Sequence, residues 1–163
     1  TVNYCAWPAF AQALLFLLMF TGGCSGSTAG GIKVIRWVIL RKQALNEMQR
    51  LLHPHGVFSI QLNRRPGRKD VVYSVAGFIF VYFVCLLITF LAAALTGADL
   101  LTDITAALTL VGNIGAAFGR VGSGGDFSFF PHWAKVVFSF SMLAGRLELY
   151  TIVILCVPAF WRR

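Results

Sequence analysis

The composition of this 163-residue chain excludes a soluble domain. Hydrophobic side chains make up 58% of the residues, with 15 Phe, and only 12% are charged, against about 25% in a soluble domain of this size. Four Cys are too few for a small disulfide scaffold, and the apolar content excludes a disordered or collagen-like chain. We therefore expect an all-α integral membrane protein.

The net charge of +8 comes from basic side chains that gather between apolar stretches. They are Arg41, Lys42, Arg50, Arg64, Arg65, Arg68 and Lys69, with Arg162 and Arg163 at the end. Cationic segments that flank apolar spans mark the cytoplasmic side of a membrane protein. Nucleic-acid binding, which a basic balance also suggests, is disfavoured because apolar spans lie on both sides of the basic stretch.

Residues 1–56 predict one membrane span that is broken in its middle. The apolar stretch 8–20 has 13 residues, too few to cross a hydrocarbon core of about 30 Å, and apolarity resumes only between Ile32 and about Leu52. Residues 21–31 between them hold five Gly. Non-helical backbone at membrane depth is tolerated only inside protein or along a watery cavity, so we interpret this break as an intramembrane gate or binding element. The alternative is a polar extracellular loop, which would leave a short helix that spans nothing.

A basic cytoplasmic linker over residues 57–70 leads into the clearest membrane helix of the chain. Residues 71–95 contain no charge over 25 positions, enough to cross the bilayer, and we expect an outer helix over 71–96. Because the basic side chains precede it, this helix would begin in the cytoplasm and end outside.

The rest of the chain predicts a re-entrant segment and a long final helix. Residues 104–118 are apolar but too few to span, and they would begin outside, so we expect a pore helix over 100–111 and a filter over 112–117. The alternative is a short lid helix that lies flat on the membrane. Residues 130–161 predict an inner helix that ends at two cytoplasmic arginines.

A weak internal repeat with an offset of 123 residues supports this division. The matched pairs are Pro8 with Pro131, Ala11 with Ala134, Met19 with Met142, and Gly22 with Gly145. We infer that residues 1–56 hold the second helix of one repeat and that residues 71–163 hold the next repeat.

The turn at Gly112–Gly115 has the composition of a cation filter. Such a filter aims backbone carbonyls inward, which requires glycine where a Cβ would clash or where φ is positive. The preceding helix would point its negative C-terminal end at the same place. Asp99 and Asp103 would lie near the opposite, positive end, where we expect a capping or helix-dipole role.

Arg146 lies deep in the last apolar stretch, where a charged side chain costs at least ~2.5 kcal/mol. By the repeat offset it aligns with Gly23, which predicts that the two face each other across a pore. The alternative is a pairing between Arg146 and a segment outside this chain.

The sequence predicts no bound cofactor. Residues 26–33 resemble a nucleotide-binding P-loop only superficially, because one residue separates the second glycine from Lys33 and no strand precedes the motif. The cysteines and histidines also lack the spacing of a zinc site.

Three segments carry a resemblance to a known family. They are FTGGCSGSTAGGIKVIR (20–36), VGNIGAAFG (111–119) and SMLAGRLELYTIVILCVPAFWRR (141–163). The chain resembles the Trk/Ktr/HKT superfamily of potassium transporters, most closely its bacterial TrkH/TrkG members. That family has four helix–pore-loop–helix repeats around one cation pathway. The resemblance implies that this chain holds about one and a half of them and begins just after the third filter.

The resemblance also implies which residues form the pathway. The filter would consist of Asn113, Ile114, Gly115 and Ala116, whose carbonyls would replace part of the hydration shell of K⁺. The gate would combine the intramembrane loop with two basic side chains, at Gly22, Gly23, Gly26, Gly30, Gly31, Lys33 and Arg146.

The implied activity is potassium uptake, by symport or as a channel, through a multi-pass protein of the bacterial inner membrane. The implied partners are membrane lipid, a second copy of the full-length protein, and a TrkA-type regulator that binds NAD and ATP. That regulator would dock on residues 41–69 and the C-terminal tail. A non-conducting membrane scaffold is the alternative function. A membrane enzyme is disfavoured because the sequence lacks an intramembrane cluster of His, Asp and Glu.

Overall fold

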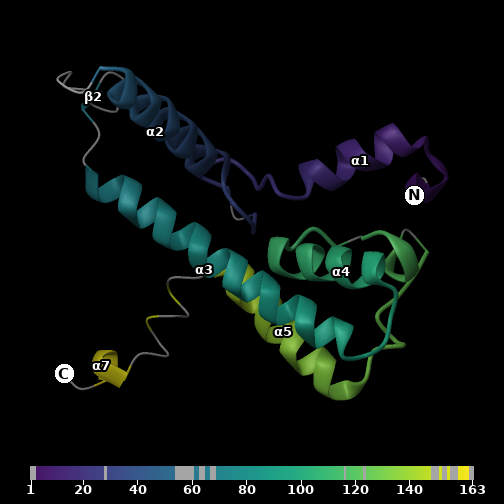
Figure 1. The fold of residues 1–163 in the computed structure, drawn as a ribbon. Helices are drawn as coiled ribbons and strands as arrows, with labels where there is room; N and C mark the ends of the chain where they lie inside the picture. Colours follow the sequence, from purple (N-terminus) through teal and green to yellow (C-terminus); the bar gives the residue numbers. More distant parts are fainter. Residues whose placement is uncertain are drawn as a thin grey trace.

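The fold is helical and is built around one long helix (Figure 1). The computed structural model describes residues 3–27, 29–53, 61–62, 65–66, 69–115, 117–122, 124–147, 151, 154 and 158–161. Within these residues the only strands are a pair of two-residue segments. The all-α class expected from the composition is therefore confirmed.

Helix α1 (Ala9–Leu18) has a fixed start and an uncovered surface. A 3₁₀ turn, η1 (Tyr4–Ala6), precedes it, and Gln12 Nε2 donates to the carbonyls of Cys5 and Trp7, each at 2.9 Å. None of the ten residues of α1 is buried in the described part of the chain. This apolar helix therefore leaves its side chains available to lipid or to other protein.

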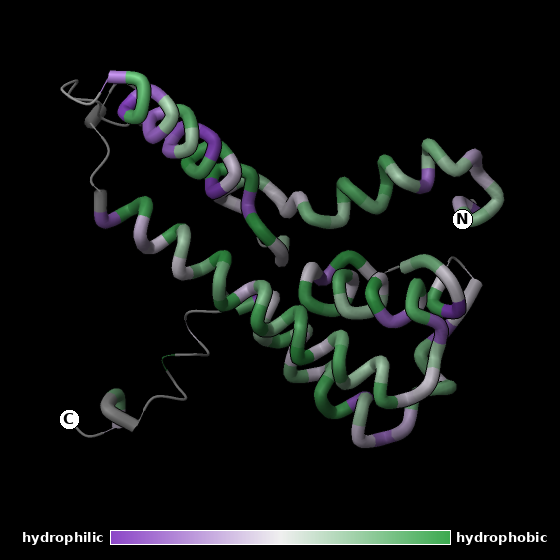
Figure 2. The backbone as a smooth tube through the Cα atoms, in the orientation of Figure 1, coloured by the Kyte–Doolittle hydropathy of each residue, from purple (hydrophilic) through white to green (hydrophobic). Residues whose placement is uncertain are grey.

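Helix α2 (Val34–Leu52) continues the chain beyond the glycine-rich break and mixes apolar with polar side chains along its length (Figure 2). The Arg36 guanidinium carbon lies 3.6 Å from the ring centroid of Phe78, and this cation–π contact joins α2 to the next helix. Residues 57–60, 63–64 and 67–68 of the expected linker lie outside the described residues. Further along, β1 (Gln61–Leu62) pairs antiparallel with β2 (Arg65–Pro66).

Helix α3 (Lys69–Ala94) is the one helix among the described residues that is long and apolar enough to cross a membrane. Its hydrophobic colouring is almost continuous in Figure 2. It begins two residues before the expected start at residue 71. Beyond its C-terminus, the Thr96 hydroxyl donates to the Ala93 carbonyl at 2.6 Å, and Gly97 adopts a φ of +77°. That left-handed turn reverses the chain.

The core forms where α4 (Leu100–Gly112) and α5 (His132–Arg146) pack against the C-terminal half of α3 (Figure 1). Its buried members are mostly small or aromatic: Ala92, Ala93, Ala106, Leu110, Ala117, Val121, Phe130, Ala134 and Phe138. Small side chains let helix backbones approach closely. The hydroxyl oxygens of Thr89 and Ser141 lie 2.7 Å apart and join α3 to α5 inside the core.

The final helix differs from the continuous inner helix expected over residues 130–161. Helix α5 ends at Arg146, and Leu147 leaves the helical conformation with a ψ of 9°. Residues 148–150 lie outside the described residues, and α7 (Pro158–Trp161) lies away from the bundle (Figure 1). Gly145 lowers helix propensity in the last turn of α5, and Pro158 is the first residue of α7, a position where proline is tolerated.

The loop between α4 and α5 is held by close backbone packing. Its turns are closed by hydrogen bonds from the Ala117 N–H to the Val121 carbonyl at 3.1 Å and from the Gly125 N–H to the Gly122 carbonyl at 2.9 Å. A methyl group added at Gly125 would overlap the carbonyl of Arg120. The backbone therefore has no room for a larger residue at that position.

We predict that Gly125→Ala destabilises the protein, whereas Gly124→Ala does not. The added methyl at Gly125 meets rigid backbone, which should lower the free energy of unfolding by about 1–3 kcal/mol. A methyl at Gly124 has no atom within 4 Å. Thermal unfolding of both variants in detergent measures the difference, and equal melting temperatures would contradict this packing.

Candidate functional site

The segment that follows α4 has positive φ angles at Asn113 and Gly115, a backbone conformation that few residue types adopt. Asn113 caps the helix in the left-handed region, with φ 53° and ψ 44°. Asparagine is one of the few residues with a side chain that tolerate this conformation. Gly115 has a φ of +106°, and a methyl there would meet no atom within 4 Å. Glycine at this position is therefore required by backbone conformation and not by crowding.

The carbonyl oxygens of Asn113, Ile114 and Gly115 are left unpaired, while the N–H groups of the first two are used. The Asn113 N–H donates to the Leu110 carbonyl at 3.4 Å, and the Ile114 N–H donates to the Thr109 carbonyl at 3.0 Å. Within the described residues, the carbonyls of Asn113, Ile114 and Gly115 accept no hydrogen bond. They follow the negative end of α4. Ala116, the fourth expected filter residue, lies outside the described residues.

Residues 113–115 form what we call the filter segment. The chain beyond it is anchored by three side chains whose role the sequence analysis did not predict. The Phe118 N–H donates to the Thr105 hydroxyl at 3.3 Å, and the Arg120 N–H donates to the Thr102 hydroxyl at 3.2 Å. The Tyr4 hydroxyl donates to the Ala117 carbonyl at 2.5 Å. Two threonines three positions apart on one face of an apolar helix were a usable signal for the first pair. No local pattern indicates a partner 113 residues away.

The glycine-rich break folds into a closed loop. The Gly22 N–H donates to the Ile32 carbonyl at 2.9 Å, and the Val34 N–H donates to the Gly23 carbonyl at 3.2 Å, so the two limbs pair. Gly31 requires glycine through its φ of +78°. Gly26 lies at the tip, where a methyl would meet nothing within 4 Å.

One end of this loop is anchored in the protein interior. Ile32 is fully buried and packs in a cluster with Phe78, Tyr82, Val111 and Ala144. These residues come from α3, α4 and α5. The loop is therefore seated on the helical core, directly beside the C-terminal end of α4.

The loop and the filter segment meet at Asn113. A methyl added at Gly30 would lie 2.9 Å from the Gly112 carbonyl oxygen and 3.0 Å from Asn113 Nδ2. On the other side, a methyl at Gly145 of α5 would overlap the Val111 carbonyl and lie 2.9 Å from Asn113 Nδ2. The structure thus brings the expected gate glycines against the expected filter.

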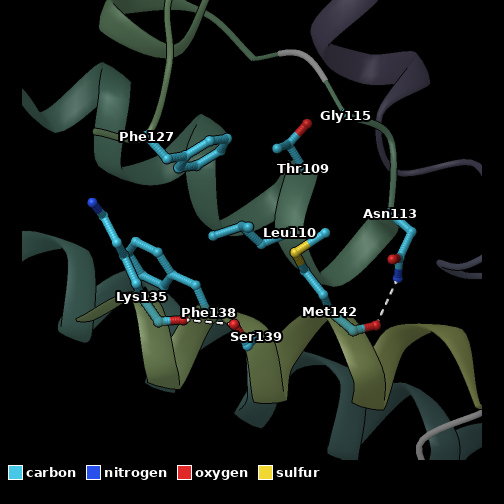
Figure 3. Close-up of a pocket in the computed structure, with 9 residues that line it drawn as sticks. All are labelled: Thr109, Leu110, Asn113, Gly115, Phe127, Lys135, Phe138, Ser139 and Met142. Carbon is cyan, nitrogen blue, oxygen red and sulfur yellow. Dashed lines mark hydrogen bonds between the residues drawn. The ribbon is translucent and has the colours of Figure 1, made fainter. Parts of the chain in front are cut away.

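Asn113 also binds the inner helix directly. Its Nδ2 donates to the carbonyl oxygen of Met142 at 3.0 Å (Figure 3). Asn113 is therefore joined to α5 by this hydrogen bond and is packed against the loop by close contact.

The two expected gate cations lie at helix ends. Lys33 is the N-cap residue of α2, and Arg146 is the last residue of α5, with an exposed side chain. Arg146 makes no hydrogen bond or ion pair in the part of the chain that the structure describes. The structure therefore does not join Arg146 to the loop.

Both acidic residues lie at the N-terminal end of α4, as expected, with Asp103 in its first turn. Asp99 is the N-cap residue, but its side chain makes no capping hydrogen bond. Asp103 is 3% exposed, and its Oδ1 has no hydrogen-bond partner in the described part of the chain.

A third acidic residue, Asp126, lies in the loop between α4 and α5. Hydrogen bonds from the Ser128 hydroxyl and N–H hold the pKa of Asp126 below its usual value.

A cavity of about 300 Å³ lies between the filter segment and α5 (Figure 3). Its lining residues are Thr109, Leu110, Asn113, Gly115, Phe127, Lys135, Phe138, Ser139 and Met142. The Lys135 ammonium donates to the Ser128 carbonyl at 3.1 Å. Among the described residues, no three His, Cys, Asp or Glu side chains could hold a metal ion together.

Comparison with known proteins shows which family the chain resembles. The TrkH model, described as a cation transport protein, matches residues 1–163. The chain is 37% identical to the Trk system potassium uptake proteins TrkI of Halomonas elongata and TrkH of Escherichia coli K12, over 99% of its own length and 33% of theirs.

A solved structure agrees with these relatives. The crystal structure of the potassium transporter TrkH from Vibrio parahaemolyticus has a TM-score of 0.85 and 38% identity to this chain, covering 99% of it and 34% of that transporter. The chain thus spans about a third of the length of the relatives it matches. It belongs to the TrkH family of cation transport proteins.

Proposed function

We propose that this chain supplies one and a half of the four helix–pore-loop–helix repeats of a potassium uptake transporter. Residues 1–56 provide the second helix of the third repeat, and residues 71–163 provide the fourth repeat. The match over the whole chain to a cation transport family supports this function, as do relatives named for potassium uptake. The same relatives disfavour the non-conducting scaffold.

The observation that carries the proposal is the row of unpaired carbonyls at Asn113, Ile114 and Gly115. Ile114 and Gly115 are exposed and Asn113 is half-buried, so these carbonyl oxygens at a helix C-terminus are open to an ion. Coordination of a dehydrated K⁺ would use them, because carbonyl oxygens replace its hydration shell without any covalent step. Ala116 completes this set in the proposal. The other three repeats would supply the rest of the ring.

The paired loop at 21–31 is the proposed gate, together with Lys33 and Arg146. Its close contact with Gly112 and Asn113 supports this assignment, because a gate beside the proposed filter could block the ion pathway. The exposed guanidinium of Arg146 would add positive charge on the pathway and oppose cation passage while the gate is closed.

The remaining surfaces fit a multi-pass protein of the bacterial inner membrane. The exposed apolar side chains of α1 and α3 would meet lipid or the other repeats. The basic stretch 41–69 would face the cytoplasm, where a nucleotide-binding regulator of the TrkA type would dock. In this proposal the full-length protein is a homodimer and this chain is not an enzyme.

We predict that Gly115→Ala in the full-length transporter lowers K⁺/Na⁺ discrimination, whereas Gly97→Ala leaves it unchanged. Both glycines have positive φ and open surroundings, so alanine strains each backbone by about 1–2 kcal/mol. Only at Gly115 does that strain move filter carbonyls, and a loss of roughly tenfold corresponds to 1.4 kcal/mol. Competition uptake of K⁺ against Na⁺ measures the ratio. Equal ratios in both variants would contradict the filter assignment.

We predict that deleting residues 25–27 from the loop tip raises potassium flux. The deletion shortens the loop while leaving the hydrogen bonds of Gly22 and Gly23 with the opposite limb available. The matched control replaces the same three residues with alanine and so keeps the length. The gate assignment fails if the deletion variant, expressed normally, carries no more flux than the alanine control.

A further inference from the structure

Asn113 is the residue at which the loop, the filter segment and the inner helix converge. We propose that Asn113 is a positioning residue that couples the position of the intramembrane loop to the conformation of the filter. This inference rests on the proposed function, since it assigns a regulatory link between the two elements named there. It concerns the side chain of Asn113, in addition to its backbone carbonyl.

The Asn113 amide is confined on three sides. Nδ2 lies 3.0 Å from the Met142 carbonyl oxygen, which accepts its hydrogen bond. Methyl groups added at Gly30 and at Gly145 would lie 3.0 and 2.9 Å from the same nitrogen. Two glycines from different elements thus leave only enough space for this side chain. A larger residue at Gly30 or at Gly145 must therefore shift or compress the Asn113 side chain.

Such a shift reaches the filter because Asn113 belongs to it. Its backbone holds a left-handed conformation at the end of α4, and Gly115 follows two residues later with a φ of +106°. Rotation of the backbone at Asn113 redirects its own carbonyl and the peptide that follows. Gly115 has no side chain to resist that movement and meets no atom within 4 Å.

The loop side of this junction is equally well defined. Gly30 is buried and lies against Gly112 and Asn113. A methyl group added at the neighbouring Gly31 would lie 3.7 Å from the Cα atom of Gly112. When the loop leaves the pathway, Asn113 loses its packing on this side and keeps its bond to α5. The filter then relaxes toward the inner helix. Ion selectivity therefore depends on the loop, and by linkage the ions in the filter bias the loop.

The test compares Gly30→Ala with Gly26→Ala in the full-length transporter. Both variants add one methyl to the same loop, but only the first adds it beside Asn113. We expect Gly30→Ala to change the K⁺/Na⁺ uptake ratio by at least about threefold. Gly26→Ala should keep the wild-type ratio, whatever its total flux. A Gly30→Ala variant that changes only flux would overturn the coupling.

The double variant assigns the effect to Asn113. Asn113→Gly removes the side chain and tolerates the left-handed backbone, so Gly30→Ala should have no further effect on the ratio in that background. A full effect there would mean that the Gly112 carbonyl transmits the change, which overturns the assignment. If potassium uptake and its dependence on Gly115 hold while this test fails, only the coupling is wrong. If the transporter takes up no potassium, the proposed function itself fails.

A labelling experiment covers the case in which Gly30→Ala does not fold. Cys24 lies in the loop and Cys5 lies outside it, and both side chains are exposed. Thiol labelling of the full-length transporter, read by peptide mass spectrometry, reports the two rates separately. Asn113→Gly should raise the rate at Cys24 relative to Cys5, because the loop loses its contact. An unchanged ratio of rates would contradict the coupling.

Discussion

The structure depends on a close approach of three backbone segments around Asn113. The loop after α1, the end of α4 and the last turn of α5 meet there at distances that leave no space for a Cβ at Gly30 or Gly145. Because glycine occupies those positions, the loop can lie against the filter segment and α5 can lie against α4. A larger residue would separate the elements that the proposed pathway needs side by side.

This packing explains how the chain can leave carbonyl groups unpaired without losing its shape. The N–H groups at Asn113 and Ile114 bond back into α4, and the buried hydroxyls of Thr102 and Thr105 hold the chain beyond the filter segment. The N–H groups of Asn113 and Ile114 are therefore used within the fold, and their carbonyl oxygens accept no hydrogen bond in the described part of the chain. The helix dipole of α4 adds negative potential at the same point.

The sequence predicted the helical class, and it predicted the glycine-rich break because apolar runs of 13 residues cannot span a membrane. The repeat also has a structural counterpart, since Pro8 and Pro131 each directly precede a helix. What could not be predicted depends on distant partners. The hydroxyl of Tyr4 meets the Ala117 carbonyl, and the Asn113 amide meets α5, through contacts that no local pattern encodes. The end of α5 at Arg146 was also not predicted, although Gly145, Arg146 and Glu148 interrupt the apolar stretch there.

The central claim is that this chain contributes part of a potassium pathway which the other repeats complete. Rubidium uptake in a bacterial strain without its own potassium uptake systems tests it most directly, with the full-length protein and this chain expressed separately. We expect uptake by the full-length protein and none by the 163-residue chain, because one quarter of a filter encloses no pore. Absence of uptake by a well-expressed full-length protein, with its cytoplasmic regulator present, would contradict the account.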